Sequence, residues 1–420
     1  MKIEFISNNA IMNIGIFISF FVFILILTIF VIFIISFFKK RKFKDFHPNI
    51  SIIIPMYNEE KNIKKCISSI LKSNYNLKKT EILCVDDGST DNTKKIIDSL
   101  SNKNKIVKLI SGKHNGKSDA VNLGIKHTKH DYIIMIDADT IIHKNFIKEI
   151  IRPFSDKKVG ATNGVGFIDN PKTITERFQD VEYQYNNLIR TSFSKVFGNG
   201  IWFFGAAACY RKDILKKVGN FKKDILTEDF DMSLKIFGLN LDVLVVENAR
   251  YYTAPMKNLK ELFIQRSRWF FGGIQCVFKH FKLIKKNSFA IKYLFFNQIF
   301  WTIFSIINIP MIIYQVFYWL PNIKSEIIPY LFRWFSVFGP IYVLYKIPEW
   351  GISFLSLFGI LSGIFTTILI LLSINKFKEK LNISRIFILI FYFPYTIVLN
   401  FILVLSLIKY SKSKNKYFLK

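Results

Sequence analysis

Residues 81–87 read EILCVDD and residues 132–139 read YIIMIDAD, so in both places a short apolar run ends in two aspartates. Short apolar runs that alternate with amphipathic stretches predict strands connected by helices, here between about residues 48 and 257, in a mainly parallel sheet. Ligands of such sheets bind at the carboxyl ends of the strands. Two separate strands are therefore predicted to deliver carboxylates to one crevice.

The start of this region contains one apolar run typical of a strand and one stretch with helical spacing. Residues 50–54 read ISIII and predict a buried strand that ends at Pro55. The apolar residues within 63–71 then recur at helical spacing. One strand and one helix are thus expected before the first acidic pair.

Paired carboxylates at strand ends suit a substrate with a diphosphate. Such a leaving group gains negative charge as its bond to a sugar breaks, and a divalent cation held by one or two carboxylates can neutralise that charge. Asp137 and Asp139 have a suitable spacing. Taken alone, either acidic pair is more often a solvated turn, and Ser89 or Thr90 could simply cap the next helix.

The composition indicates a membrane protein. Of 420 residues, 51% are hydrophobic and 16% aromatic, and the mean hydropathy is +0.27. Residues 13–38 carry no charge, are long enough to cross about 30 Å of hydrocarbon, and are followed at once by the basic residues 39–42. We predict a transmembrane helix over 11–38 with a cytoplasmic basic flank. A cleaved signal peptide fits less well, because its charges would precede the apolar run.

The second half of the chain predicts a carboxy-terminal transmembrane region over 289–408, with three or four spans. Segment 327–347 contains two charged residues, Arg333 and Lys346, and the pair Gly339-Pro340, and is expected to be broken or re-entrant. We favour four spans, which would place the basic tail 409–420 in the cytoplasm but the basic loop before the last span outside. Three spans would place that loop in the cytoplasm and the tail outside. The apolar segments are 289–320, 327–347, 352–374 and 386–408, and the basic residues of that loop are Lys376, Lys378, Lys380 and Arg385.

The net charge of +29 does not point to nucleic acid. The lysines are scattered and no standard nucleic-acid-binding motif is present, so we expect no nucleic-acid partner. Basic clusters at 39–44, 279–286 and 409–420 suit anionic membrane lipids on the cytoplasmic leaflet, although a lysine-rich proteome would account for much of the excess.

The four cysteines are far apart and none forms a Cys-x-x-Cys pair. They lie in apolar sequence, which predicts reduced core residues without a disulfide framework or a zinc site.

Residues 258–288 predict an amphipathic helix in the membrane interface. Gln265, Arg268 and Trp269 fall at i, i+3 and i+4 and so share one helix face. Spacing alone would be satisfied by a surface helix with an aromatic anchor.

Six motifs in this order resemble those of the inverting family-two glycosyltransferases. They read PMYNEE at 55–60, VDDGSTD at 85–91, GKSDAVN at 116–122, DAD at 137–139, TED at 227–229 and Q-x-x-R-W at 265–269. The last two together resemble the membrane-integrated branch that includes the cellulose, hyaluronan and poly-N-acetylglucosamine synthases. The likeness covers nearly the whole chain. It implies a multi-pass protein of the cell membrane with an α/β GT-A (Rossmann-like) catalytic domain over 48–257 in the cytoplasm and flanking transmembrane helices.

The resemblance also implies roles for individual residues. A UDP-sugar donor would be bound by Tyr57, Glu59, Asp86, Asp87, Lys117, Asp137 and Arg268. The acceptor would be bound by Gln265, Trp269, Phe204 and Glu228. Asp139 would hold Mg²⁺ or Mn²⁺, and Asp229 would be the general base that activates the acceptor hydroxyl. Independently of the family, Thr227 could cap a helix whose first turn is acidic.

Three classes of function follow. The first is processive extension of a polysaccharide from UDP-N-acetylglucosamine, which could be coupled to export of the polymer. It is favoured because the layout, with one initial span and no added carboxy-terminal domain, resembles the poly-β-1,6-N-acetylglucosamine synthases. The second is transfer of one sugar to a membrane lipid, as in ceramide-type glucosyltransferases. The third, a transporter or receptor with an inactive nucleotide-binding domain, is disfavoured because the motif residues are all present. The sequence leaves the linkage and any accessory subunit unspecified.

Overall fold

The computed structural model describes residues 9–199, 202–286, 288–319, 327–377 and 383–412. In these residues a mixed eight-stranded sheet has the order β3-β2-β1-β4-β7-β6-β8-β5. The strands are β1 (Ile50–Met56), β2 (Thr80–Asp86), β3 (Val107–Ser111), β4 (Tyr132–Ile136), β5 (Ile141–Ile142), β6 (Val159–Ile168), β7 (Ala207–Arg211) and β8 (Asp242–Thr253).

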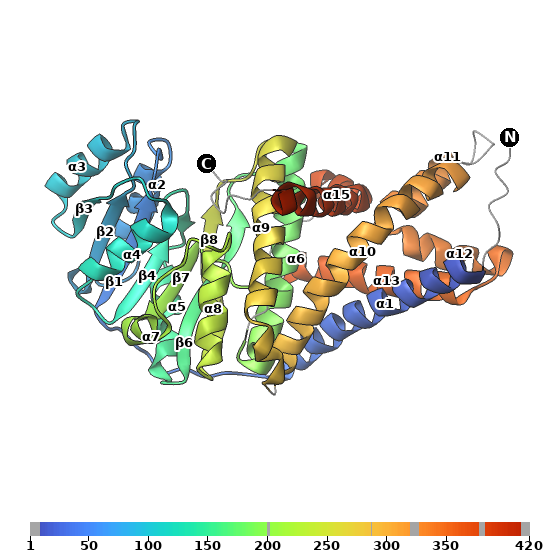
Figure 1. Ribbon diagram of the computed structural model, residues 1–420, viewed down its shortest axis with the longest axis horizontal. Coiled ribbons are helices and arrows are strands. Elements are labelled where there is room, and N and C mark those ends of the chain that lie inside the picture. The colour runs from blue at the N-terminus through green and yellow to red at the C-terminus, as the bar shows by residue number, and fades with distance from the viewer. Residues whose placement is uncertain (1–8, 200–201, 287, 320–326, 378–382, 413–420) are drawn as a thin grey trace.

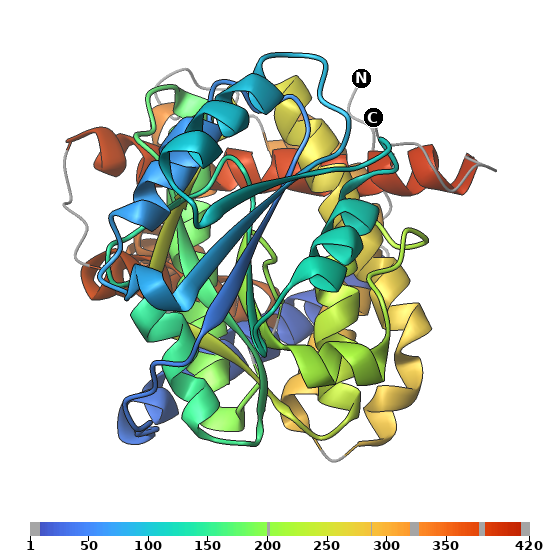
Figure 2. The same cartoon turned by 90° about the vertical axis from the view of Figure 1, so that its left-hand side faces the viewer.

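Helices cover both faces of the sheet (Figures 1 and 2). Isoleucines of α2 and α5 pack with one face, and apolar residues of α4, α6 and α8 pack with the other. These helices are α2 (Ile63–Leu71), α3 (Thr93–Lys103), α4 (Lys117–His127), α5 (Phe146–Ile151), α6 (Ile174–Phe197), α7 (Lys212–Val218) and α8 (Glu228–Gly238). The predicted helical spacing within 63–71 is confirmed, because Ile63, Cys66, Ile67 and Ile70 are all buried on one side of α2.

Strand β1 continues through Pro55 to Met56, two residues beyond the predicted end at Ile54. Pairing with β4 ends at Ile53, whereas pairing with β2 continues to Met56. Proline is tolerated there because it lies where β1 has only one hydrogen-bonded neighbour.

The sheet is less parallel than the sequence predicts, since β7 is antiparallel to both β4 and β6. After α6 the chain passes from Asn199, which pairs with Val243 at the start of β8, to Ala206, whose carbonyl accepts from Asp137 at the end of β4. This extra passage along the sheet reverses the direction of β7. It also brings the segment before β7 to the carboxyl edge of the parallel strands.

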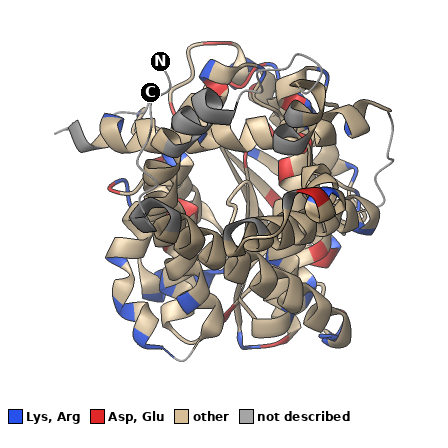
Figure 3. Cartoon of the chain, turned by 90° about the vertical axis from the view of Figure 1, so that its right-hand side faces the viewer, with Lys and Arg blue, Asp and Glu red and all other residues tan. Residues whose placement is uncertain are grey.

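Helices α6 and α9 (Leu259–Lys279) stand side by side between the sheet and the remaining helices (Figure 1). Beyond them lies an apolar helical region, in which most of the ribbon carries neither acid nor base (Figure 3). It consists of α1 (Asn9–Phe38), α10 (Phe289–Trp319), α11 (Ile327–Phe335), α12 (Gly339–Trp350), α13 (Phe354–Lys376), α14 (Ile383–Ile390) and α15 (Tyr392–Lys412). In the described part of the chain, four helices (α1, α10, α13 and α15) are long and apolar enough to cross a membrane.

The predicted segment 327–347 forms two short helices, α11 and α12, with a break at 336–338. The described residues do not include Gly200, Ile201, Lys378, Lys380 or the end of the basic tail, 413–420. All four cysteines are free and buried, as expected.

Candidate active site

The loops that follow β1 and β2 interlock at the carboxyl edge of the sheet. Asn58, at a φ of 55°, accepts a hydrogen bond from the Thr90 amide (2.8 Å) and donates its own amide to Ser89 Oγ (3.0 Å). The Glu59 amide donates to Thr93 Oγ1 (2.7 Å). These bonds fix the direction in which Tyr57 and Glu59 enter the cavity described below.

Asp87 and Asp86 have different environments. The Asp87 carboxylate accepts from the amides of Asn115 (2.9 Å) and Gly116 (2.7 Å), so it ties the β2 loop to the start of α4. Beside it the rings of Tyr57 and His114 lie 4.4 Å apart, inclined by 32°. Asp86 is buried and accepts from the Ser89 amide (3.1 Å), so it shapes the turn and does not border the cavity, contrary to its predicted place in the nucleotide site.

Asp137 and Asp139 follow β4 and leave a surplus of negative charge. Lys117 Nζ lies 2.7 Å from Asp137 Oδ1 and 3.5 Å from Glu228 Oε1. Burial raises the pKa of Asp139 to about 7, and the carboxylates of Asp137 and Glu59 add to this effect. A cation placed here would relieve that repulsion.

The residues present fit a divalent cation whose ligands come partly from the protein and partly from a diphosphate. Among the described residues, no three His, Cys, Asp or Glu side chains are grouped so that they could hold a metal ion by themselves. Mg²⁺ is ordinarily bound by one or two carboxylates together with substrate phosphates and water. Asp139, with Asp137 beside it, could supply the protein's share.

Asp229 is held at the start of α8. Its Oδ2 accepts from the Gly205 amide (2.5 Å) and its Oδ1 from the Phe230 amide (2.8 Å). A Cβ on Gly205 would lie 2.5 Å from the Asp229 Cβ, so only glycine permits this approach. Burial raises the pKa of Asp229 to about 6, with a further contribution from Glu228 that Lys117 opposes.

Thr227 does not make the predicted helix cap. It occupies the position before α8, but its side chain accepts no capping hydrogen bond and instead lies 3.5 Å from the Cys276 sulfur on α9. Gly272 of α9 allows this close approach, because a Cβ there would lie 2.7 Å from Thr227 Cγ2. The threonine therefore joins α8 to α9.

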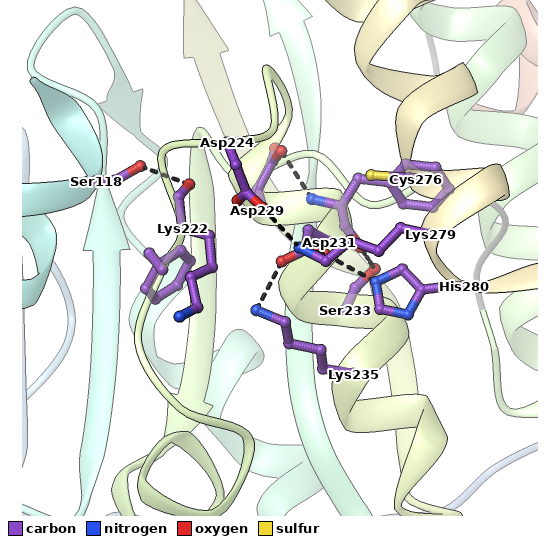
Figure 4. Close-up of polar contacts among 12 residues, drawn as sticks. Ser118, Lys222, Asp224, Asp229, Asp231, Ser233, Lys235, Cys276, Lys279 and His280 are labelled. Carbon is purple, nitrogen blue, oxygen red and sulfur yellow. Dashed lines mark hydrogen bonds and ion pairs between the residues drawn. The ribbon is translucent and has the colours of Figure 1, made fainter. Parts of the chain in front are cut away.

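A buried ionic cluster strengthens the same junction (Figure 4). Asp231 is 1% exposed, and its carboxylate lies 2.7 Å from His280 Nε2, 2.7 Å from Lys235 Nζ and 3.1 Å from Lys279 Nζ. Burial alone would raise the pKa of Asp231, but the hydrogen bonds from His280 and Lys235 hold it well below its usual range. Helix α9 is thereby fixed relative to the helix that carries Asp229.

Two buried arginines enclose a pair of aromatic rings at the other end of the cavity. Phe204 and Trp269 stack with centroids 5.9 Å apart and an angle of 24°. Arg190 lies 3.9 Å from the Phe204 centroid, and Arg266 lies 4.2 Å from the Trp269 centroid. Arg266 also pairs with Glu182 of α6 at 2.8 Å. Aromatic side chains that border a cavity suit contact with the apolar parts of sugar rings.

One cavity of about 680 Å³ is bordered by the acidic strand ends, by Asp229 and by the Phe204 and Trp269 rings. The predicted site residues that line it are Tyr57, Glu59, Asp87, Lys117, Asp137, Asp139, Phe204, Glu228, Asp229, Gln265, Arg268 and Trp269. Among the predicted residues only Asp86 lies apart from it.

Sequence reasoning missed a second group of residues that line the cavity. They are Glu182, Tyr183, Tyr185 and Asn186 of α6, Arg266 of α9, Asn297, Gln298 and Trp301 of α10, and Tyr392, Leu399 and Leu403 of α15. One available signal lay in α6, where polar residues occupy the side of the helix that is buried and that an ordinary surface helix would fill with apolar residues. In α10 the adjacent amides Asn297 and Gln298, within a mostly apolar helix, were a second signal, whereas the cavity residues of α15 had none.

Residues 51–219 match the family model described as Glycosyl transferase family 2. These residues, about two fifths of the chain, resemble a family-2 glycosyltransferase domain. The resemblance predicted from the motifs is thereby confirmed over residues 51–219.

Two curated relatives of this part of the chain carry the same name. Poly-beta-1,6-N-acetyl-D-glucosamine synthase of Staphylococcus aureus (strain COL) is 30% identical over 253 residues, and that of Staphylococcus epidermidis is 32% identical over 254 residues. Each alignment covers 60% of this chain and 61% of the relative, so the shared part is about three fifths of the relatives' length.

A solved structure extends the likeness of fold to nearly the whole chain. The mannosyltransferase PcManGT from Pyrobaculum calidifontis, in complex with GDP-Man and Mn²⁺, superimposes with a TM-score of 0.61 over 96% of this chain and 99% of that one. Identity is 14%, so this comparison concerns the fold alone.

Proposed function

We propose that the protein is a membrane-bound inverting β-glycosyltransferase that extends a polysaccharide from a UDP-sugar, with UDP-N-acetylglucosamine as the preferred donor. The observation that carries the proposal is the position of Asp229. It borders one cavity between the acidic strand ends and the Phe204 and Trp269 rings. A group there can take a proton from an acceptor while the acceptor oxygen attacks the donor sugar.

The donor would lie at the acidic end of the cavity. Tyr57, Glu59 and Asp87 would surround the uridine, as the family resemblance implies, and Lys117 and Arg268 would neutralise the diphosphate. Asp139, beside Asp137, would hold Mg²⁺ or Mn²⁺, which supplies positive charge against the leaving diphosphate.

The acceptor would lie against Trp269 and Phe204, with Gln265 and Glu228 as polar contacts. Its hydroxyl would give its proton to the Asp229 carboxylate as the oxygen bonds to the anomeric carbon. The bond from that carbon to the diphosphate breaks at the same time, and its electron pair leaves with UDP. A single displacement of this kind inverts the anomeric configuration.

The pH dependence of transfer tests the base. Since Asp229 acts as a carboxylate and burial raises its pKa to about 6, activity should be lost as the pH falls through about 6, two units above the range of an ordinary aspartate. We expect kcat/KM, which reports the groups of the free protein, to fall about tenfold for each pH unit below that value. The measurement is a profile of kcat/KM for the acceptor at saturating Mg²⁺, with UDP binding followed over the same range. A rate that is constant down to pH 4.5 would contradict this assignment.

Polymer synthesis is proposed over single transfer for two reasons. The curated relatives carry the name of a polymer synthase. The cavity also continues past Trp269 to Asn297, Gln298 and Trp301 of α10, amide and aromatic side chains that suit further sugar units. Transfer of one sugar to a membrane lipid remains the second candidate, since α10 and α15 border the same cavity.

Product size separates the two candidates. Membranes containing the protein would be incubated with labelled UDP-N-acetylglucosamine and Mg²⁺ or Mn²⁺, beside Asp229→Asn and a chelator control. We expect high-molecular-weight product that both controls abolish. A small lipid-extractable product would select single transfer, and incorporation that persists with chelator would exclude the cation.

We further propose that the protein is a multi-pass protein of the cell membrane with its family-2 domain in the cytoplasm. Support comes from the long apolar helices and from the basic residues that follow α1. UDP-sugars are made in the cytoplasm, so this orientation also places the donor site where its substrate is.

A further inference from the structure

The last helix, α15, is 21 residues long, or about 31 Å, which is enough to cross a bilayer. We propose that α15 instead lies along the membrane surface next to the family-2 domain, so that only α1, α10 and α13 cross. This inference rests on the proposed membrane location but not on the donor, the acceptor or the product.

Both ends of α15 contact the layer formed by α6 and α9. Near its start, Tyr395 stacks on Phe178 of α6 with centroids 5.1 Å apart and donates a hydrogen bond to Glu182. Near its end, Tyr410 stacks on Phe271 of α9 at 4.7 Å. A crossing helix would leave that layer by about 30 Å at one end. The contacts therefore hold α15 parallel to the layer.

The figures agree with this orientation. In Figure 1 α15 is seen nearly end-on beside α9, whereas α1 and α10 extend away from the sheet. In Figure 2, turned by 90°, the red helix runs across the view. Helix α15 is thus transverse to the helices proposed to cross.

Aromatic contacts fix the directions of those helices. Phe20 and Phe30 of α1 contact Phe358 and Phe365 of α13, respectively, at 5.3 and 4.8 Å, so α1 and α13 run in the same direction. Tyr293 near the start of α10 donates to the Leu25 carbonyl (3.2 Å), while Phe300 lies near Phe21 (6.2 Å), so α10 runs in the opposite direction.

The end of α13 returns to the family-2 domain, where Lys376 lies 3.3 Å from Glu247 of β8. Helices α11 and α12 have 9 and 12 residues, each too short to cross, and the first turn of α12 packs on the middle of α13, where Pro340 meets Gly363. The chain therefore enters α14 from the side of the catalytic domain. Arg385 of α14 accordingly pairs with Asp180 of α6 at 2.9 Å.

This arrangement removes a conflict in the sequence. With four spans the loop of Lys376 and Arg385 is exported, and with three full spans that include α15 the basic tail is exported. With α15 along the surface, Lys376, Arg385 and Lys409 all face the cytoplasmic side, as the positive-inside tendency requires.

The two faces of α15 suit such a position. The buried side contains Tyr392, Tyr395, Ile402, Leu403 and Ser406, and it includes residues that wall the cavity. The opposite side exposes Phe401, Leu405 and Ile408, and the helix α10, which contacts α15, also exposes Ile303 and Ile306. The partner we assign to this outer face is the hydrocarbon edge of the bilayer. The acceptor end of the cavity would then lie at the level of the membrane surface.

Single cysteines test the proposal, because the four native cysteines are buried. Phe391→Cys and Lys409→Cys mark the two ends of α15, while Phe354→Cys and Asn375→Cys mark those of α13 as a matched crossing control; all four positions are exposed. In sealed inside-out vesicles with a membrane-impermeant maleimide, we expect labelling at 391, 409 and 375, and labelling at 354 only after permeabilisation.

Labelling of 391 and 409 from opposite sides of the membrane would overturn the proposal. Labelling of 354 and 375 from the same side would show that α13 does not cross, and would overturn the proposal as well. If the cysteines label poorly, the depth of spin labels in the bilayer gives a second test. Spin labels at Phe401→Cys and at Ile303→Cys in the middle of α10 should report a shallow and a deep position, respectively. Equal depth at both positions would also reject α15 as a surface helix.

Discussion

Asp229→Asn is expected to lower the rate of sugar transfer by roughly 10²- to 10⁴-fold while UDP still binds. Asparagine preserves the shape of the side chain but cannot take the acceptor proton. Only one of its terminal atoms can accept a hydrogen bond, whereas the carboxylate accepts from both Gly205 and Phe230. Transfer would be measured in single turnover, and UDP affinity by calorimetry on the same preparation.

Asp224→Asn is the matched control. Its side chain is 52% exposed and lies 3.7 Å from Lys279, on the segment that leads to α8 (Figure 4). The same chemical change there should leave transfer close to that of the parent protein. If Asp229→Asn loses UDP affinity together with activity, Asp229 belongs to donor binding and another group must act as the base.

The parts of the site that sequence could predict are those governed by strand ends. Strands β1, β2 and β4 are adjacent and parallel, so the residues that follow them meet at one edge whatever the loops do. Asp87, Asp137 and Asp139 were therefore predictable from apolar runs alone. The shared face of Gln265, Arg268 and Trp269 followed in the same way from helical spacing.

The parts that sequence could not predict depend on contacts between distant segments. Glu182 and Arg266 are 84 residues apart, and neither position has a local pattern that names the other. Asp86 and Asp87 are neighbours of one chemical type, yet only the second borders the cavity, because strand alternation turns their side chains apart. Hydropathy also could not distinguish a crossing α15 from one along the surface, since α15 is long and apolar enough to cross and only its contacts with α6 and α9 indicate its direction.

Glu182→Gln is expected to destabilise the protein by about 3 kcal/mol, because it leaves Arg266 buried without a countercharge. The Arg266 side chain is 1% exposed and that of Glu182 is 13% exposed. The midpoint of thermal unfolding in detergent should fall by roughly 5 °C. Since Arg266 lies 4.2 Å from the Trp269 centroid, KM for the acceptor should also rise, with a smaller change in kcat.

Two variants separate stability from positioning. Asp213→Asn breaks the exposed pair with Arg211 and should cost at most about 1 kcal/mol. Glu182→Gln combined with Arg266→Met removes both buried charges and keeps an acceptor for the Tyr395 hydroxyl, so it should restore the unfolding midpoint but not the KM, because the guanidinium no longer supports the indole ring. If the double variant recovers both quantities, Arg266 contributes to folding alone and the Trp269 ring is positioned by Phe204 and Tyr183, whose centroids lie 5.9 and 6.4 Å from it.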